Sequence, residues 1–269
     1  MKRATGQRVR AVLVVLLVTA AIQASAADEE VRSIPTRRGV TQSFLLVRPP
    51  GAPTANLILF PGGDGRLALS PPNSIGQMRN NFLVRMRGRF AHAGFLVAVM
   101  DTPSDRVDEY NWRTSKEHAE DIKQVIAALR EMASAPVWLV GTSMGTLSAA
   151  NAAARLTEGG PDGLVLTSSV TVTSQKIGES VKTVRLGDIR VPTLVVRHKD
   201  DGCKSSPPSE GPAIIKALTQ ANPKELLTFE GGSPPKSEPC EALAQHGYIG
   251  IEREVVDAIV GWIHAAHQD

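Results

Sequence analysis

The stretch VWLVGTSMGTLSAA, from Val137 to Ala150, decides the fold class of this chain of 269 residues. Four apolar residues lead into Gly-Thr-Ser-Met-Gly, and an alanine-rich segment that predicts a helix follows. The pattern Gly-x-Ser-x-Gly between a buried strand and a helix is typical of a nucleophile elbow, a sharp turn that projects the serine hydroxyl. The alternative is a tight turn with an incidental serine, and the flanking strand and helix favour the elbow. Ser143 is therefore a candidate nucleophile.

Short apolar runs alternate with longer amphipathic segments along the rest of the chain. Several runs are apolar at consecutive positions, which is typical of strands buried on both faces of a parallel sheet. Apolar stripes predict helices over 114–132 and along the last segment, 251–263. This alternation predicts one α/β domain with a doubly wound, mostly parallel sheet. The predicted strands are 44–49, 56–60, 95–100, 137–140, 163–168, 193–197 and 225–229.

Two local patterns refine this prediction. Thr114 and Glu117 have the spacing of a capping box, which predicts that the helix over 114–132 begins there. The segment between the strand ending near Ser168 and the strand starting at Thr193 is long enough for a loop and a short helix. It is too short for a substantial lid.

The first residues predict a cleaved signal peptide, residues 1–26. The segment MKRATGQRVR carries four basic and no acidic residues, the apolar run AVLVVLLVTAAI follows, and small residues stand at Ala24 and Ala26. The apolar run is shorter than the roughly 20 residues that a spanning helix needs, so a retained anchor is the weaker alternative. We therefore expect an exported mature domain over 27–269, periplasmic or secreted, without a stable membrane anchor.

The charge balance gives no case for nucleic-acid binding. The chain has 30 Lys and Arg against 27 Asp and Glu, and four of the basic residues lie in the predicted signal peptide. The mature chain would carry 26 basic and 27 acidic residues, so its apparent basicity is mostly a targeting feature.

The two cysteines of the chain, Cys203 and Cys240, predict a disulfide, because an exported protein folds where disulfides can form. Closing a loop of about 38 residues would stabilise the fold by roughly 4 kcal/mol in the chain-entropy estimate. Two free thiols are the alternative. A zinc site with the nearby histidines and aspartates lacks any close Cys-x-x-Cys or His-Glu-x-x-His spacing, so we expect no metal.

An activated serine needs a base, and the base needs an orienting acid. The chain order for an elbow of this kind is serine, acid, histidine. Asp200 and Asp201 follow the predicted strand at 193–197, and His246 precedes the last helix. The remaining histidines are assigned to loops, to the surface or to the polar face of a helix. These are His92, His118, His198, His264 and His267.

Two backbone N–H groups are expected to hold a developing oxyanion. One belongs to Met144, directly after the nucleophile. The other is expected from PGGDG, Pro61 to Gly65, where glycines let the backbone approach a substrate carbonyl. A phosphate-binding loop is the rival interpretation, but no Gly-Lys-Ser/Thr follows these glycines.

Taken together, these motifs resemble the α/β-hydrolase superfamily over essentially the whole mature chain. LFPGGDG resembles the oxyanion motif with Pro61 where His is usual, GTSMG the elbow, RHKDDGC the acid loop and HGYIGIE the histidine loop. The resemblance implies the α/β-hydrolase fold, and the short segment between Ser168 and Thr193 predicts that it lacks a large lid domain. Matching the acid turn implies Asp201 as the triad acid, with Asp200 as the alternative. Gly63 is the first choice for the second oxyanion donor and Gly62 the second choice.

The chain is most similar to a group of exported bacterial members with an Asp-x-Cys acid loop and a second cysteine shortly before the histidine. This resemblance implies a disulfide that ties the acid loop to the histidine loop. The expected function is a serine hydrolase that cleaves a small-molecule carboxylic ester through Ser143, His246 and Asp201, without a cofactor. A loop over 70–82 is expected to shape its site. The alternatives are a peptidase or amidase of the same fold, or a non-catalytic binding protein on a hydrolase scaffold.

Overall fold

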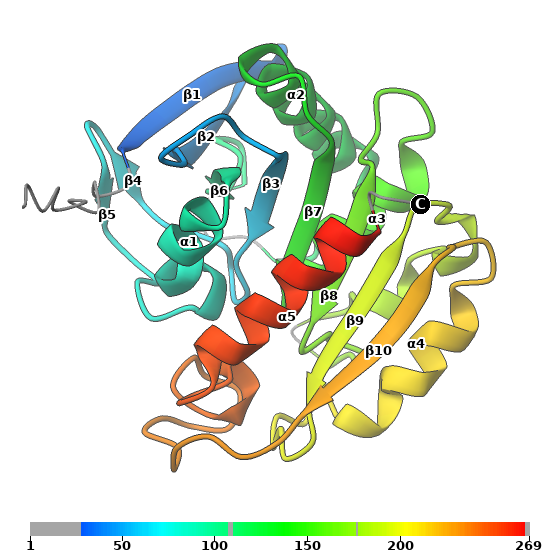
Figure 1. The fold of residues 1–269 in the computed structure, drawn as a ribbon. Coiled ribbons are helices and arrows are strands. Elements are labelled where there is room, and N and C mark those ends of the chain that lie inside the picture. Colours follow the sequence, from blue (N-terminus) through cyan, green and yellow to red (C-terminus); the bar gives the residue numbers. More distant parts are fainter. Residues whose placement is uncertain (1–27, 107–109, 176, 267–269) are drawn as a thin grey trace, which may run out of the picture.

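The computed structural model describes residues 28–106, 110–175 and 177–266. In this part of the chain, eight strands form one sheet in the order β1-β2-β6-β3-β7-β8-β9-β10 (Figure 1). The strands from β6 to β10 in this order are parallel, whereas β2 is antiparallel to both of its neighbours. A separate short ladder joins β4 to β5. The strands are β1 (Glu29–Arg37), β2 (Val40–Val47), β3 (Ala55–Phe60), β4 (Leu69–Ser70), β5 (Ser74–Ile75), β6 (Phe95–Met100), β7 (Val137–Thr142), β8 (Gly163–Thr167), β9 (Thr193–His198) and β10 (Lys224–Phe229).

Helices cover both faces of the sheet. Helices α1 and α5 lie in front of it in the view of Figure 1, and α2, α3 and α4 lie behind it. The α-helices are α1 (Phe82–His92), α2 (Lys116–Met132), α3 (Gly145–Arg155), α4 (Gly211–Ala217) and α5 (Glu252–Ala265). Short 3-10 turns are η1 (Val181–Thr183), η2 (Leu186–Asp188), η3 (Pro208–Glu210) and η4 (Gln245–Gly247). The doubly wound, mostly parallel sheet predicted from the sequence is confirmed.

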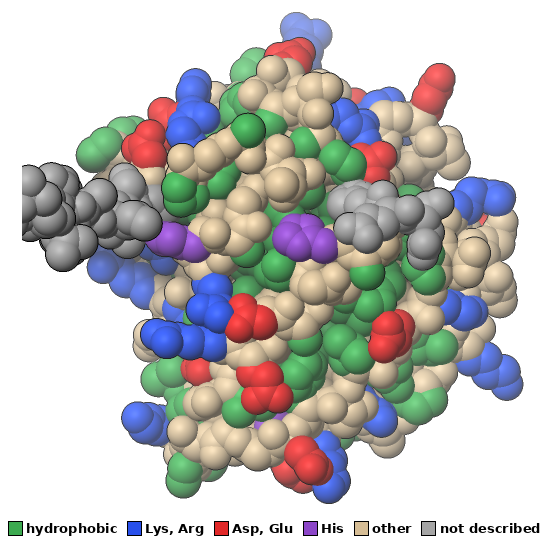
Figure 2. Space-filling model, viewed as in Figure 1, with side chains coloured by type: hydrophobic (Ala, Val, Ile, Leu, Met, Phe, Trp, Pro, Cys, Tyr) green, Lys and Arg blue, Asp and Glu red, His purple; other side chains and the backbone are tan. Residues whose placement is uncertain are grey.

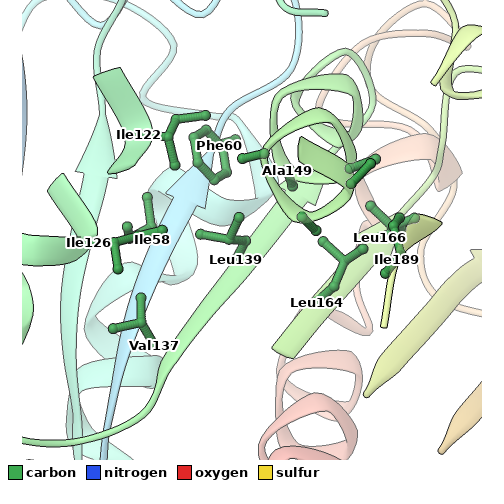
Figure 3. Packing of buried hydrophobic residues seen from close by; sticks show 14 of the residues in the cluster. Ile58, Phe60, Ile122, Ile126, Val137, Leu139, Ala149, Leu164, Leu166 and Ile189 are labelled. Atoms are coloured by element: carbon green, nitrogen blue, oxygen red, sulfur yellow. The ribbon is translucent and has the colours of Figure 1, made fainter. Parts of the chain in front are cut away.

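The core consists of two apolar layers, one on each face of the sheet. Every residue of β3, β6 and β7 is buried, as expected for central strands whose side chains meet helices on both sides. Figure 3 shows the layer behind the sheet, where Ile122 and Ile126 of α2 and Ala149 of α3 pack against strand residues such as Ile58 and Leu139. The consecutive apolar runs of the sequence are therefore explained by burial on both faces.

Each of the seven predicted strands is present, but three further strands were not predicted. The edge strand β1 has the sequence EEVRSIPTR, and none of its residues is fully buried. Its mixture of charged and apolar residues lacks the apolar run that marks the inner strands. Strands β4 and β5 are two residues long, too short for any periodicity to appear.

The described residues of the connection between β8 and β9 form no lid domain. They contain only the 3-10 turns η1 and η2. The sequence-based expectation of a fold without a large lid domain is confirmed.

The predicted start of α2 was wrong by one residue. Ser115, not Thr114, caps the helix, and its hydroxyl accepts a hydrogen bond from the N–H of His118 at 3.1 Å. Both the N–H and the hydroxyl of Thr114 instead donate to the carboxylate of Glu179, far along the chain. A tertiary contact therefore occupies the residue that the local spacing selects.

The prediction that His118 lies on a polar helix face was also wrong. Its side chain is buried, with its ring centroid 4.5 Å from that of Trp112 and 6.5 Å from that of Phe60. The helix face that carries His118 looks polar in the sequence because it also contains Asp121, whose charge is matched by strand β1. Arg37, at the end of β1, binds the fully buried carboxylate of Asp121 at 2.8 Å.

Three predictions concern the two ends of the chain: the signal peptide, His264 and His267. The predicted signal peptide, residues 1–26, and His267 lie outside the described residues. None of the described helices has both the length and the apolar character needed to cross a membrane. His264, expected at the surface, is half-buried, and its ring packs 5.2 Å from that of Phe95. The apolar stripe of α5 continues to the end of the helix and carries this histidine inward.

We predict that His118 makes the fold sensitive to acid. Burial, and then the nearby charges of Arg113 and Arg37, hold the pKa of His118 well below its usual range. Below about pH 6.5 the unfolded chain therefore binds a proton at His118, whereas the folded chain does not. The free energy of unfolding should fall below that pH by up to about 1.4 kcal/mol per pH unit.

Urea unfolding at pH 5 and pH 7.5 tests this prediction. In a His118→Leu variant, the loss of stability between the two pH values should be smaller than in the wild type. His92→Leu, at the exposed end of α1, is the matched control. An equal loss of stability in the wild type and in His118→Leu would contradict the prediction.

Candidate active site

Ser143 stands in a strained turn between β7 and α3. Its φ angle is +53°, a left-handed conformation that residues other than glycine rarely adopt. The N–H of Ser143 donates to the carbonyl of Thr167 on the neighbouring strand at 3.0 Å. Its carbonyl accepts hydrogen bonds from the N–H and the hydroxyl of Thr146, in the first turn of α3. Backbone bonds on both sides thus hold the serine in a conformation that costs free energy.

The two glycines of the elbow are required by close backbone contacts. A Cβ atom on Gly145 would lie 2.0 Å from the carbonyl oxygen of Phe60, at the end of β3. A Cβ atom on Gly141 would lie 2.5 Å from the carbonyl oxygen of Gly145. Helix α3 can therefore cross the ends of β3 and β7 at this distance only when both positions lack a side chain.

Asp201 and His246 are brought together from two loops. Asp201 follows β9, and its Oδ1 accepts the N–H of Cys203 at 2.9 Å. Its Oδ2 lies 2.9 Å from Nδ1 of His246. Because a carboxylate only accepts hydrogen bonds, Nδ1 carries the proton in this pair. The alternative acid, Asp200, is exposed, and its N–H donates to the ring of His198 at 3.0 Å.

His246 has one nitrogen engaged and one without a partner. Its side chain is buried, and among the described residues Nε2 forms no hydrogen bond. Ser206 adds a contact on the engaged side, with its hydroxyl 3.1 Å from Nδ1 of His246 and 3.5 Å from Oδ2 of Asp201. The ring is thus held through Nδ1 and presents a free lone pair at Nε2. No motif in the sequence indicated the contribution of Ser206.

A second set of hydrogen bonds holds the backbone around His246. The hydroxyl of Ser168, directly after β8, donates to the carbonyl of His246 at 2.9 Å and lies 3.0 Å from the phenol oxygen of Tyr248. The phenol donates to the carbonyl of Val196 in β9 at 3.1 Å. Tyr248 is fully buried, and burial raises the pKa of its phenol. These contacts fasten η4 to the ends of β8 and β9, and pattern analysis did not find them.

His198 has a structural role in the acid loop. It is buried at the end of β9, and its Nε2 lies 3.1 Å from the carbonyl of Gly231. Both ring nitrogens are therefore occupied by backbone groups, which agrees with its assignment to loop structure.

The expected oxyanion donors lie around Ser143. We use the name oxyanion loop for Pro61–Gly65, which follows β3. A Cβ atom on Gly62 would lie 2.9 Å from Cβ of Ser143, so this glycine stands directly against the serine. Gly63 has a φ of +52° and borders the same pocket. Met144 is buried at the N-terminus of α3, where backbone N–H groups point out of the helix.

Ser143 and His246 open into one pocket of about 500 Å³. One wall comes from the end of the segment expected to shape the site, just before and at the start of α1. Another part of the lining comes from the loop between β10 and η4, which the sequence did not indicate as part of the site. The lining residues are Gly62, Gly63, Met78, Asn80, Asn81, Phe82, Thr142, Ser143, Ser237, Cys240, Glu241, Ala242, Leu243, His246 and Gly247.

The predicted disulfide is present between Cys203 and Cys240, which are 37 positions apart. Cys203 is buried two residues after Asp201, and Cys240 borders the pocket six residues before His246. The bond therefore joins the loop that carries the acid to the loop that carries the histidine. Both sulfurs are consumed by this bond, so neither is a thiolate ligand for a metal.

Comparison with known proteins identifies the fold. No protein-family model matches the sequence, and no curated protein matches it significantly. Among solved structures, an esterase from Pyrococcus furiosus is similar with a TM-score of 0.63 and 13% identity, over 89% of this chain and 93% of that one. An α/β serine hydrolase without a lid, from Xanthomonas campestris, has a TM-score of 0.57 and 16% identity, over 89% of this chain and 97% of that one.

A longer protein is equally similar. Dipeptidyl peptidase 4 from Porphyromonas gingivalis has a TM-score of 0.63 and 13% identity over 89% of this chain. The chain spans about a third of that protein's length, 36%. These likenesses establish that the chain has the α/β-hydrolase fold, and the resemblance seen in the sequence is confirmed at this level.

We predict that the disulfide stabilises the fold as well as the site. In a Cys203→Ala/Cys240→Ala variant the free energy of unfolding should fall by roughly 4 kcal/mol, because the unfolded chain regains the entropy of a loop of about 38 residues. Chemical denaturation monitored by circular dichroism measures the change. A reductant should lower the free energy of unfolding of the wild type toward that of the variant, and it should leave the free energy of the variant unchanged. Equal stability of the two oxidised proteins would contradict the prediction.

Proposed function

We propose that this chain is an exported serine hydrolase that cleaves a carboxylic ester through an acyl-enzyme. One observation carries the proposal: His246 is bound to Asp201 through Nδ1 and leaves Nε2 unpartnered in the pocket that Ser143 also borders. An imidazole held in this tautomer is a base at Nε2, and the strained serine borders the same pocket. This is the arrangement that activates a hydroxyl for attack.

The proposed reaction follows from these roles. Ser143 attacks the carbonyl carbon of the ester while Nε2 of His246 takes the hydroxyl proton. The proton then passes to the departing alcohol, which leaves an acyl group on Ser143. His246 then deprotonates a water molecule, which attacks the acyl carbon. The bond to Ser143 breaks, His246 returns the proton to the serine oxygen, and the acid is released. Asp201 keeps the imidazole oriented and stabilises its positive charge in both steps.

The oxyanion of each tetrahedral intermediate is assigned to the N–H groups of Met144 and Gly63, with Gly62 as the alternative to Gly63. The N-terminus of α3 adds a favourable dipole at this point. Donors of this kind are worth about 3–4 kcal/mol each to the transition state when they are already in place. The position of Gly62 against Ser143 supports a role for the oxyanion loop.

The pocket supports a small ester as the substrate. Its volume of about 500 Å³ lies within the roughly 300–1,000 Å³ typical of small-molecule sites, and the described part of the chain contains no lid domain. Esters also need less leaving-group assistance than amides. The likeness to dipeptidyl peptidase 4 keeps a peptidase or amidase as the catalytic alternative. A binding protein with an unused triad is the non-catalytic alternative.

Charge on the molecule agrees with a small, uncharged substrate. On the face shown in Figure 2, acidic and basic side chains of the described residues are interspersed, as on a protein without a nucleic-acid surface. Among the described residues that line the pocket, Glu241 carries the formal negative charge, and no Lys or Arg is present. An anionic group on the substrate would therefore meet the charge of Glu241 without a Lys or Arg side chain in the pocket lining.

The proposal of export rests on the N-terminal segment and on the disulfide. A structural disulfide persists in oxidising compartments and is rare in a reducing cytosol. The bond between Cys203 and Cys240 therefore supports a periplasmic or secreted location, with 1–26 removed and 27–269 as the mature domain.

We predict that Ser143 reacts with a fluorophosphonate probe. The mature protein should be labelled at Ser143, and Ser143→Ala should not be labelled or hydrolyse short aryl esters. Ser169→Ala is the matched control, because this buried serine follows β8 and lies outside the pocket. A folded wild type that neither reacts with the probe nor cleaves esters would move the assignment to the binding-protein alternative.

We also predict selection against negative charge in the substrate. At low ionic strength, kcat/KM for a mono-aryl succinate should be about threefold to tenfold below that of the matched uncharged ester, and added salt should reduce the difference. Glu241→Gln should reduce the difference in kcat/KM between the two esters. Glu238→Gln, on the same loop but outside the pocket lining, should not reduce it. An anionic ester cleaved as well as its neutral match would refute this substrate preference.

A further inference from the structure

A buried arginine lies behind the oxyanion loop. Arg113 precedes α2, and its side chain is 4% exposed. Its Nη2 lies 3.2 Å from the carbonyl oxygen of Pro61, 3.5 Å from that of Gly62 and 3.3 Å from that of Gly63. Its Nη1 donates to the hydroxyl of Ser148 on α3 at 2.9 Å. One guanidinium thus joins the oxyanion loop to the helix that carries the nucleophile at its start.

The loop is shaped around this side chain. A Cβ atom on Gly65 would lie 2.4 Å from Nη2 of Arg113, and Gly65 has a φ of +82°. On the other side, the indole of Trp112 lies 4.9 Å from the guanidinium carbon. The carboxylate of Glu179 accepts the backbone N–H of Arg113 at 3.2 Å. Glycine at position 65 therefore leaves the space that the guanidinium fills.

Burying the charge of Arg113 costs free energy, which suggests that the residue has a role in the site. Burial lowers the pKa of Arg113 to about 10, although the charges of Glu179 and Asp64 act in the opposite direction. The group is still a cation at neutral pH, and its guanidinium hydrogen bonds go to neutral carbonyl and hydroxyl oxygens. Placing a charge in the interior costs several kcal/mol before its hydrogen bonds are counted. A methionine of similar length would avoid that cost but would leave the carbonyls of the oxyanion loop without this donor.

We propose that Arg113 is a positioning residue that aims the oxyanion donors. In a planar trans peptide the carbonyl and the following N–H point in opposite directions. A donor that binds the carbonyls of Pro61 and Gly62 from behind therefore directs the N–H groups of Gly62 and Gly63 away from itself. The cation also polarises these peptides, which makes their N–H groups stronger donors. The inference rests on the proposed function in one respect, that this loop receives a tetrahedral oxyanion.

Kinetics on Arg113→Met and Arg113→Lys test the inference against a matched control. Arg130→Met is suitable because Arg130 also binds a loop carbonyl, that of Gly160 at 2.8 Å, at the opposite end of α2. In Arg113→Met, kcat should fall about 100-fold with KM within about threefold, because the donors matter most in the transition state. The affinity for a trifluoromethyl ketone, which forms a tetrahedral adduct with serine, should fall in parallel. Arg113→Lys should be intermediate, and Arg130→Met should keep wild-type values.

Hydrogen exchange of the oxyanion loop gives a readout that does not depend on activity. Amides of the peptide covering 61–65 should exchange faster in Arg113→Met than in the wild type or in Arg130→Met. Ser148→Ala, which removes one partner and keeps the cation, should show a smaller increase and a few-fold lower kcat. This variant and Arg113→Lys decide the question if Arg113→Met does not fold.

The outcomes separate the two proposals. A wild type without esterase or probe reactivity overturns the proposed function, while exchange in 61–65 still decides the positioning role. An active wild type whose Arg113→Met variant retains kcat, ketone affinity and loop protection overturns the inference about Arg113. A loss of stability without a change in these three quantities would assign Arg113 to structure alone and would likewise overturn it.

Discussion

Much of this architecture follows from the contact between α3 and the end of β3. The carbonyl of Phe60 occupies the space that a side chain at Gly145 would need, with 2.0 Å to the position of its Cβ. Because the helix begins this close to the strand, the residue before it must turn sharply, and Ser143 takes a positive φ. The same contact brings the oxyanion loop, which continues β3, against the serine. Any side chain at Gly145 would push apart the two elements that must face each other.

The parallel sheet explains how the remaining components meet. The carboxyl ends of β3, β7, β9 and β10 lie at one edge, so the loops after them share a small volume. Ser143 follows β7, Asp201 follows β9, and His246 lies beyond β10. Loops at such an edge are mobile unless they are tied, and here they are tied to one another. The disulfide joins the loop of Asp201 to the loop of His246. Ser168 and Tyr248 fasten the histidine loop to the sheet.

Two arginines, Arg37 and Arg113, make buried polar contacts next to α2. Arg37 of the β1 edge neutralises Asp121 of α2, and Arg113 occupies the space between the loop and α3. Burial, and then the charges of these two cations, hold the pKa of His118 well below its usual range. Buried charges such as Asp121 are stable only when they have a defined partner, here Arg37. These contacts therefore fix the position of α2 and of Arg113, which precedes it and binds the backbone of the oxyanion loop.

The sequence by itself determined the class of the fold and the positions of its inner strands. Strands β3, β6 and β7 are buried on both faces, so their residues had to be apolar in succession, and that pattern is visible without a structure. The elbow could also be predicted from the sequence, because close backbone contacts require glycine at Gly141 and Gly145, on either side of Ser143. The disulfide could be predicted because the chain offers one pair of cysteines. Strand β1 could not, because an edge strand is half-exposed and tolerates charged residues.

Only the tertiary structure decided which groups surround these residues. The choice between Asp200 and Asp201 depends on which carboxylate turns inward, and a difference of one residue in a loop reverses that direction. The contacts of Ser206, Ser168 and Arg113 join segments far apart in the chain, so no local spacing marks them. His118 appeared to lie on a polar face because Arg37, distant in sequence, supplies the charge that lets Asp121 be buried beside it. Periodicity records whether a position is apolar, whereas the partner of a buried polar group is set by the packing of the whole chain.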